Sequence, residues 1–128
     1  MRILDFRSGD YVTILPMEDW SLCVEADSSD TVIRASDRAV KTFDLRLPEQ
    51  PIESRHNGRR LISQFKSDSK LRLVSCGLDG QVLVSSLESN HCQPSPVHSC
   101  DDYILSIDFD RTRLACGAIN GKYNLFTF

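Results

Sequence analysis

An internal repeat of 41–42 residues is the feature that most constrains how this chain can fold. Three nine-residue segments, which begin at Asp37, Asp79 and Asn120, align without a gap. Each begins with Asp or Asn, which tolerate tight turns, and two continue with Gly, as in two-residue hairpins. A fixed period of this length predicts a row of similar units, each too small to bury its own apolar faces.

Two more apolar segments precede each repeat segment. The nearer ones cover residues 31–33, 71–74 and 114–116, and the farther ones cover 20–24, 61–65 and 103–109. The stretch from Ile107 to Phe109 alternates apolar and polar residues, which is typical of a half-buried strand. No stretch has a helical period over a useful length. Each unit is therefore predicted to contain three short strands and a connecting fourth, with Trp20 packed between units.

A shortened copy of the repeat opens the chain. Residues 3–6 align with residues 42–45 at an offset of 39, and an arginine follows both, Arg7 and Arg46. Ser8 and Gly9 then form the expected turn out of that strand. The copy predicts that the first residues belong to a unit of the same kind.

The repeat resembles the WD-repeat family of β-propellers, whose repeats of about 40–45 residues form four-stranded blades. The family ends its third strand in Trp-Asp, and residues 43–46, Phe-Asp-Leu-Arg, are the nearest match. Residues 4–5, 85–86 and 126–127 are weaker occupants of that position. The resemblance covers nearly the whole chain, and it depends on the period and the turn–strand pattern.

The resemblance implies an all-β, propeller-like protein of about three four-stranded blades plus part of another. Residues 1–15 would end a preceding blade, and 16–47, 56–88 and 98–128 would form three repeats. Closed propellers need 4–8 blades, so we expect an open arc that begins and ends within a blade. Unpaired strand edges would favour self-association. A truncated product without independent function is an alternative.

The family also implies a polar network that joins a loop His, a strand Ser or Thr, a turn Asp and the Trp. The middle unit would supply His56, Ser75 and Asp79, with Ser85 in place of the aromatic residue. The last unit would supply His98 from the loop before its first strand and Asn120 from its turn, with Cys116 in place of Ser. Because these substitutions weaken the polar network, they imply that the blades are held together mainly by apolar contacts.

The residues Asp44 and Arg46, echoed by Asp5 and Arg7, are similar to the Asp-x-Arg box of WD-repeat substrate receptors in cullin-type ubiquitin ligases. There the arginine points from the propeller rim to an adaptor protein, a task that suits its planar, multiply donating guanidinium. The resemblance therefore implies a protein–protein interaction scaffold, with Arg46, Asp44 and Arg7 as candidate partner-binding residues.

The amino-acid composition narrows the classes of protein to which this chain could belong. The 128 residues carry 15 Lys and Arg against 18 Asp and Glu, a net charge of −3. This balance gives no electrostatic reason to expect nucleic acid, and no apolar run has the length of a membrane span. The start lacks the apolar core of a signal peptide. Five cysteines, an odd number, favour a reduced intracellular protein, cytoplasmic or nuclear.

No catalytic motif stands out, so an enzyme is not expected, and no cofactor is predicted. A different class of function is a small metal-binding protein. Four potential zinc ligands lie within ten residues: His91, Cys92, His98 and Cys100. Their spacing matches no standard zinc pattern. The dense basic stretch 55–60 is expected to be a solvated loop between blades.

Overall fold

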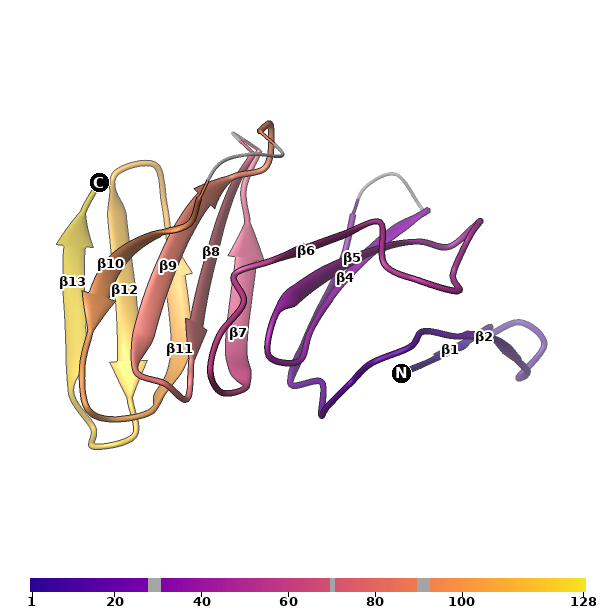
Figure 1. Cartoon of the computed structure of the whole chain (residues 1–128), viewed down its shortest axis with the longest axis horizontal. Helices are drawn as coiled ribbons and strands as arrows, with labels where there is room; N and C mark the ends of the chain where they lie inside the picture. The colour runs from indigo at the N-terminus through magenta and orange to yellow at the C-terminus, as the bar shows by residue number, and fades with distance from the viewer. Residues whose placement is uncertain (28–30, 70, 90–92) are drawn as a thin grey trace.

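The computed structural model contains four antiparallel β-sheets that follow one another along the chain (Figure 1). It describes residues 1–27, 31–69, 71–89 and 93–128, and within these ranges it has 13 strands and no helix. Accordingly, no helix of the described part could cross a membrane. The prediction of an all-β, open, propeller-like fold is confirmed.

A hairpin forms the first sheet, and complete four-stranded sheets form the next two. Every strand pairs antiparallel with its sequence neighbour. The hairpin is β1 (Arg2–Leu4) and β2 (Tyr11–Ile14). The first complete sheet contains β3 (Cys23–Ala26), β4 (Val32–Ser36), β5 (Val40–Asp44) and β6 (Glu53–Arg55). The second contains β7 (Ile62–Ser67), β8 (Arg72–Gly77), β9 (Gln81–Ser86) and β10 (Ser95–Ser99).

The last sheet has three strands in the described part of the chain: β11 (Ile104–Phe109), β12 (Arg113–Ala118) and β13 (Tyr123–Thr127). The repeat segments therefore coincide with β5, β9 and β13, the third strands of successive sheets. The hairpin strand β1 is the part of the shortened copy that aligns with β5. Gly9, in the turn between β1 and β2, has a φ of 75°.

The sheets pack against one another through two apolar clusters. The cluster between the two complete sheets contains Val40, Ile62, Phe65 and Leu73. The cluster between the second complete sheet and the last sheet is larger: Val74, Cys76, Val82, Ile104, Ile107, Leu114 and Cys116. Strand β7 contacts β3 and β4, and β11 contacts β7 and β8, so the first strands of successive sheets lie closest together.

Polar contacts between the sheets recur at the period of the repeat. The carboxylate of Glu25 accepts hydrogen bonds from the backbone N (3.3 Å) and Oγ (2.7 Å) of Ser67, which is 42 residues later. In the next interface, Lys66 Nζ lies 2.8 Å from Asp108 Oδ1, also 42 residues later. The sequence period is thus also the period of sheet-to-sheet packing.

Two sequence predictions about these strands were wrong. The first strand of the first complete sheet covers Cys23–Ala26 and not residues 20–24. Trp20 precedes it and has 77 % of its surface exposed, so it does not pack between sheets. Asp19 accepts a hydrogen bond from the backbone N of Trp20 at 2.9 Å and thereby holds a bend before the strand.

The Asp79–Gly80 turn is where the second complete sheet meets the loop that leads into the last sheet. Gly80 has a φ of 77°, and its carbonyl accepts a hydrogen bond from Cys100 N at 2.9 Å. A Cβ at this position would collide with the carbonyl oxygens of Cys100 and Asp102. Gly121 in the last sheet has a similar φ of 80°, but a Cβ there would meet nothing within 4 Å.

We predict that Gly80→Ala destabilises the protein more than Gly121→Ala does. Both substitutions place a side chain at positive φ, which costs about 1–2 kcal/mol. Only Gly80→Ala also forces two backbone segments apart, which adds about 1–3 kcal/mol. Urea unfolding followed by circular dichroism measures both values, and equal losses would contradict the proposed close approach.

Candidate functional site

The candidate partner-binding residue Arg46 lies just after β5, where it forms an ion pair with Asp44. Its Nε and Nη2 donate to the two carboxylate oxygens of Asp44 at 2.9 and 2.6 Å. The hydrogen bonds from the Arg46 side chain and backbone lower the pKa of Asp44 to about 2. The Arg46 side chain remains 73 % exposed. Arg46 is thus a surface group held in one orientation and open to a partner.

The shortened copy of the repeat has the same backbone geometry. Asp5 Oδ1 accepts a hydrogen bond from Arg7 N at 2.8 Å, as Asp44 Oδ1 does from Arg46 N at 2.9 Å. Arg7 is exposed in the turn between β1 and β2. Arg7 and Arg46 each contact the aspartate two residues before them, Arg7 in the turn after β1 and Arg46 in the loop after β5.

The middle unit contains a buried polar network centred on His56. This residue follows β6, has a φ of 55° and is 2 % exposed. Its Nδ1 lies 2.6 Å from Ser75 Oγ on β8, and its Nε2 lies 2.7 Å from Ser85 Oγ on β9. Burial, together with the charge of Arg55, lowers the pKa of His56 to about 4. The imidazole is therefore neutral at pH 7 and ties the loop to two strands.

Asp79 lies outside the His56 hydrogen bonds. Its Oδ1 accepts a hydrogen bond from Gln81 N at 3.1 Å, and the carboxylate thus closes its own turn. Asn120 does the same in the last sheet, with its Oδ1 2.8 Å from Lys122 N, and its Nδ2 donates to Asp102 at 2.6 Å. Both residues stabilise turns, and Asn120 also connects its turn to the preceding loop.

His98 lies within β10 and not in the loop before the first strand of the last sheet, as the sequence suggested. It pairs with Val82 beside an irregularity in the β9–β10 ladder, and its ring contacts β13 of the last sheet. The ring centroids of His98 and Phe126 are 5.0 Å apart, and His98 Nε2 lies 3.4 Å from Asn124 Nδ2. Asn124 also hydrogen-bonds Cys116, whose thiol pKa is raised by burial.

The first complete sheet uses a buried ion pair in place of a histidine network. Asp37 and Lys41 are 1 % and 7 % exposed, and Lys41 Nζ lies 2.8 Å from Asp37 Oδ2. Burial alone would raise the pKa of Asp37, but hydrogen bonds from Lys41, Ala39 N and Glu18 N lower it below its usual value. Glu18, whose side chain is 90 % exposed, lies 3.4 Å from Lys41 Nζ.

The sequence analysis did not predict this ion pair, although the alternation of residues along the strand indicates it. Asp37 aligns with Asp79 and Asn120, and Lys41 lies two residues before Phe43 on the same strand. Alternation along a strand therefore places Lys41 on the same face as buried Phe43. A lysine on a buried face requires a compensating carboxylate.

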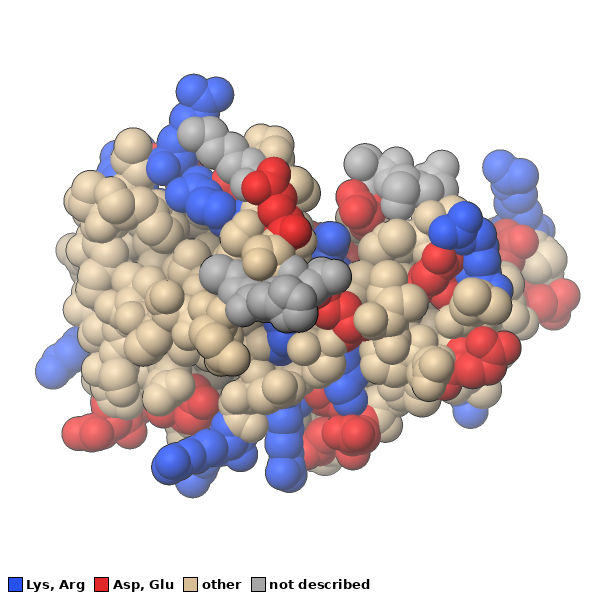
Figure 2. Space-filling view, turned by 45° about the horizontal axis from the view of Figure 1, so that its top comes forward, with Lys and Arg blue, Asp and Glu red and all other residues tan. Residues whose placement is uncertain are grey.

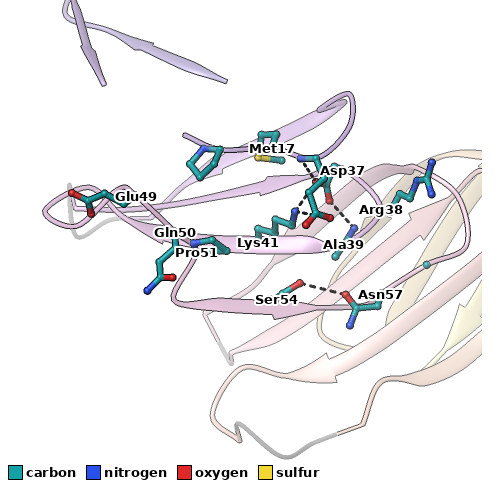
Figure 3. Close-up of a pocket in the computed structure, with 13 residues that line it drawn as sticks. Met17, Asp37, Arg38, Ala39, Lys41, Glu49, Gln50, Pro51, Ser54 and Asn57 are labelled. Carbon is teal, nitrogen blue, oxygen red and sulfur yellow. Dashed lines mark hydrogen bonds and ion pairs between the residues drawn. The ribbon is translucent and has the colours of Figure 1, made fainter. Parts of the chain in front are cut away.

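A pocket of about 550 Å³ lies beside the ion pair (Figure 3). Its walls come from residues 16–18 before β3, residues 37–39 and Lys41 at the turn into β5, the loop residues 49–51, and Ser54, Asn57 and Gly58 in and after β6. Pro16, Met17 and Pro51 give it apolar surface, and Ser54 Oγ lies 3.3 Å from Asn57 Oδ1. Its size is in the range of ligand pockets.

The fold brings these pocket residues together from separate segments. The backbone N of Gly58 donates to the carbonyl of Arg38 at 2.7 Å, and Glu18 N donates to Asp37 at 3.1 Å. Arg38 in turn pairs with Asp19 at 3.1 Å on the surface. Nonpolar walls around a few directed polar groups can hold a short peptide segment or a small polar molecule.

Two of the four residues of the metal-binding alternative, His91 and Cys92, lie outside the described residues. Cys100 Sγ donates to the carbonyl of Asp102 at 3.3 Å, and His98 makes the contacts given above. In the described ranges, no three His, Cys, Asp or Glu side chains are grouped to hold a metal ion.

The basic stretch 55–60 is divided by the fold. The Arg55 side chain folds inward, where its Nη1 donates to the carbonyl of Ser86 at 2.5 Å. Arg60 lies on the surface with its guanidinium 5.7 Å from the centre of the Tyr103 ring. The arginines of the stretch 55–60 therefore do not form one continuous basic patch.

Comparison with known proteins bears on the fold alone. No family model matches the chain, and the search of curated proteins finds no match. Among solved structures, the chain is similar to the crystal structure of the computationally designed Ika4 protein, with a TM-score of 0.79 and 15 % sequence identity. The match covers 99 % of this chain and 78 % of the designed protein.

We predict that the stability of the protein falls as the pH falls from 6.5 toward 4, in part because of His56. The pKa of His56 is lowered in the folded state, so the unfolded chain takes up a proton first. The loss is on the order of 3 kcal/mol once both states are protonated.

The variant that tests this is His56→Gln. Its side-chain amide can hydrogen-bond both Ser75 and Ser85, but it does not take up a proton in this pH range. Urea unfolding at pH 7.5 and 4.5 measures the difference for each protein. The variant should lose less stability over this interval than the wild type. Equal losses would show that another group causes the acid sensitivity.

Proposed function

We propose that this protein is a WD-repeat-type interaction scaffold whose loop surface binds a peptide segment of a partner protein. The observation that carries the proposal is the pocket beside Asp37 and Lys41, which four separate segments of the chain build. Function in such folds resides in loops positioned by a rigid framework. The repeated sheets supply that framework here.

The chemistry of the pocket suits a peptide more than an apolar ligand. Lys41 Nζ is held by Asp37 at 2.8 Å and by the exposed Glu18 at the longer distance of 3.4 Å. A carboxylate or a carbonyl oxygen of a bound peptide could replace Glu18 on Lys41. Apolar side chains of the same bound peptide would pack against Pro16, Met17 and Pro51.

We predict that Ser54→Trp abolishes partner binding because the indole fills the pocket. Ser95→Trp is the matched control, since both serines are exposed on the outer strand of a complete sheet and only Ser54 lines the pocket. Affinity capture from cells with quantitative mass spectrometry compares both variants with the wild type. A partner set that both variants retain equally would exclude the pocket as the binding site.

A finer proposal is that the scaffold is a substrate receptor of a cullin-type ubiquitin ligase, with Arg46 contacting the adaptor. The exposed Arg46 side chain supports it, because an ion pair whose arginine faces solvent is weak and can give up the arginine to a partner. A hydrogen-bonded guanidinium at the centre of an interface can contribute several times more.

We expect Arg46→Ala to weaken co-precipitation of the adaptor at least about tenfold, the equivalent of 1.4 kcal/mol. Arg113→Ala is the control, because Arg113 is also exposed (67 %) and also pairs with a nearby carboxylate, that of Asp110, at 2.7 Å. Adaptor binding that is unchanged in Arg46→Ala, or equally weakened in both variants, would exclude this role.

A further inference from the structure

Lys41 occupies a position that an apolar residue takes elsewhere in the repeat. On β5 of the first complete sheet, Lys41 pairs with Ser54 of β6. At the same place of the second complete sheet, 42 residues later, Leu83 pairs with Pro96. A buried ion pair is often no more stabilising than well-packed apolar side chains. The packing of such a sheet therefore does not require the buried charges of Asp37 and Lys41.

The Lys41 ammonium has one buried and one replaceable carboxylate partner. Asp37, whose side chain is 2 % exposed, lies 2.8 Å from Lys41 Nζ at the pocket wall (Figure 3). Glu18 lies 3.4 Å from the same nitrogen, and its side chain is 90 % exposed. The backbone of Glu18 is held separately, because its N donates to Asp37 Oδ2 at 3.1 Å. The Glu18 side chain can therefore turn into solvent while the Asp37–Lys41 pair stays in place.

The groups around this ammonium favour an anionic ligand. A cationic side chain would meet the Lys41 charge, and an apolar ligand would displace Glu18 without replacing its interaction. A ligand carboxylate would restore that interaction as a charge-assisted hydrogen bond and leave the net charge around Lys41 unchanged. Pro16, Met17 and Pro51 line the same pocket, so a ligand can pack apolar groups beside its carboxylate.

Selectivity for a carboxylate has to come from the pocket itself. The chain has a net charge of −3, and on the face that Figure 2 shows, Lys and Arg side chains lie among Asp and Glu. Such a mixture gives acidic peptides little long-range attraction. The buried Lys41 ammonium, with its replaceable partner Glu18, is then the group that distinguishes an anionic ligand from a neutral one.

We infer that the pocket selects carboxylate-bearing peptides and that Glu18 is an internal competitor, which holds the place of the ligand carboxylate on Lys41. Such selectivity rests on the proposed function, because the ligand is the peptide segment proposed above. The carboxylate can come from an Asp or Glu side chain within the peptide or from its free C-terminus. Both present the same pair of oxygens to Lys41 Nζ.

Selection from libraries of short random peptides tests the ligand class. The peptides are displayed on phage in two forms, with the C-terminus either free or fused to the coat protein. Both libraries are selected on the wild type, on Ser54→Trp, which blocks the pocket, and on Ser95→Trp as its control. Peptides that bind the wild type and Ser95→Trp but not Ser54→Trp should carry Asp or Glu beside apolar residues. Enrichment in the free library alone, without acidic side chains, would assign the carboxylate to the C-terminus.

The same selection separates failure of the selectivity from failure of the proposed function. If no peptide prefers the wild type to Ser54→Trp, the pocket is not a peptide site, and both are overturned. If peptides depend on an open pocket but need neither an acidic side chain nor a free C-terminus, the proposed function stands and the carboxylate selectivity is overturned.

Glu18→Gln tests the internal competitor, with an enriched peptide as the labelled probe in fluorescence anisotropy. Since an exposed ion pair is weak, this variant should bind the peptide roughly two- to fivefold more tightly than the wild type. Glu88→Gln is the matched control, because Glu88 is also exposed, follows β9 outside the pocket, and carries the same charge. No gain in Glu18→Gln, or an equal gain in both variants, would overturn the role of Glu18.

A neutral form of the peptide tests whether its carboxylate and Glu18 compete for one position. The acidic residue is replaced by its amide, or the C-terminus is amidated. This peptide should bind the wild type at least about tenfold more weakly, because it loses a charge-assisted hydrogen bond. It should also gain nothing from Glu18→Gln, since the two effects are coupled. An equal gain for both peptides would show that Glu18 and the ligand carboxylate do not share a position.

Discussion

The packing of one sheet on the next is the interaction on which the rest of the structure depends. Each sheet is small, so its stability depends on packing its apolar residues against a neighbouring sheet. Phe65 and Leu73 fill one interface, and Val82, Ile104 and Leu114 fill the other. Since the same positions serve each interface, the polar contacts between sheets also recur at the spacing of the repeat.

Each unit buries polar side chains where a loop meets its strands, and the residues that satisfy these groups differ from unit to unit. The middle unit buries a neutral histidine between Ser75 and Ser85, and the first complete sheet buries the Asp37–Lys41 pair. Between the second complete sheet and the last one, the ring of His98 on β10 packs at a tilt against Phe126 on β13. A buried polar group is tolerated as long as its hydrogen bonds are made, so the residues can change while the loop stays attached.

The comparison with the designed protein agrees with this view of the fold. At 15 % identity the two chains share few residues, yet they superpose with a TM-score of 0.79. Different side chains can therefore fill the same sheet-to-sheet spacing if the apolar alternation is kept. The functional proposals depend on individual groups of this chain, such as the exposed Arg46 and the pocket beside Lys41.

The sequence by itself determined the period, the all-β class and the turns, because these depend on local alternation and on residues such as Gly80 and Gly121. It could also place His56 near Ser75 through the family resemblance. Only the tertiary structure decided which charges are buried and which surfaces remain open. The Asp37–Lys41 pair, the pocket and the exposed Tyr123 depend on which sheet faces which neighbour, and that arrangement is not encoded in any short segment.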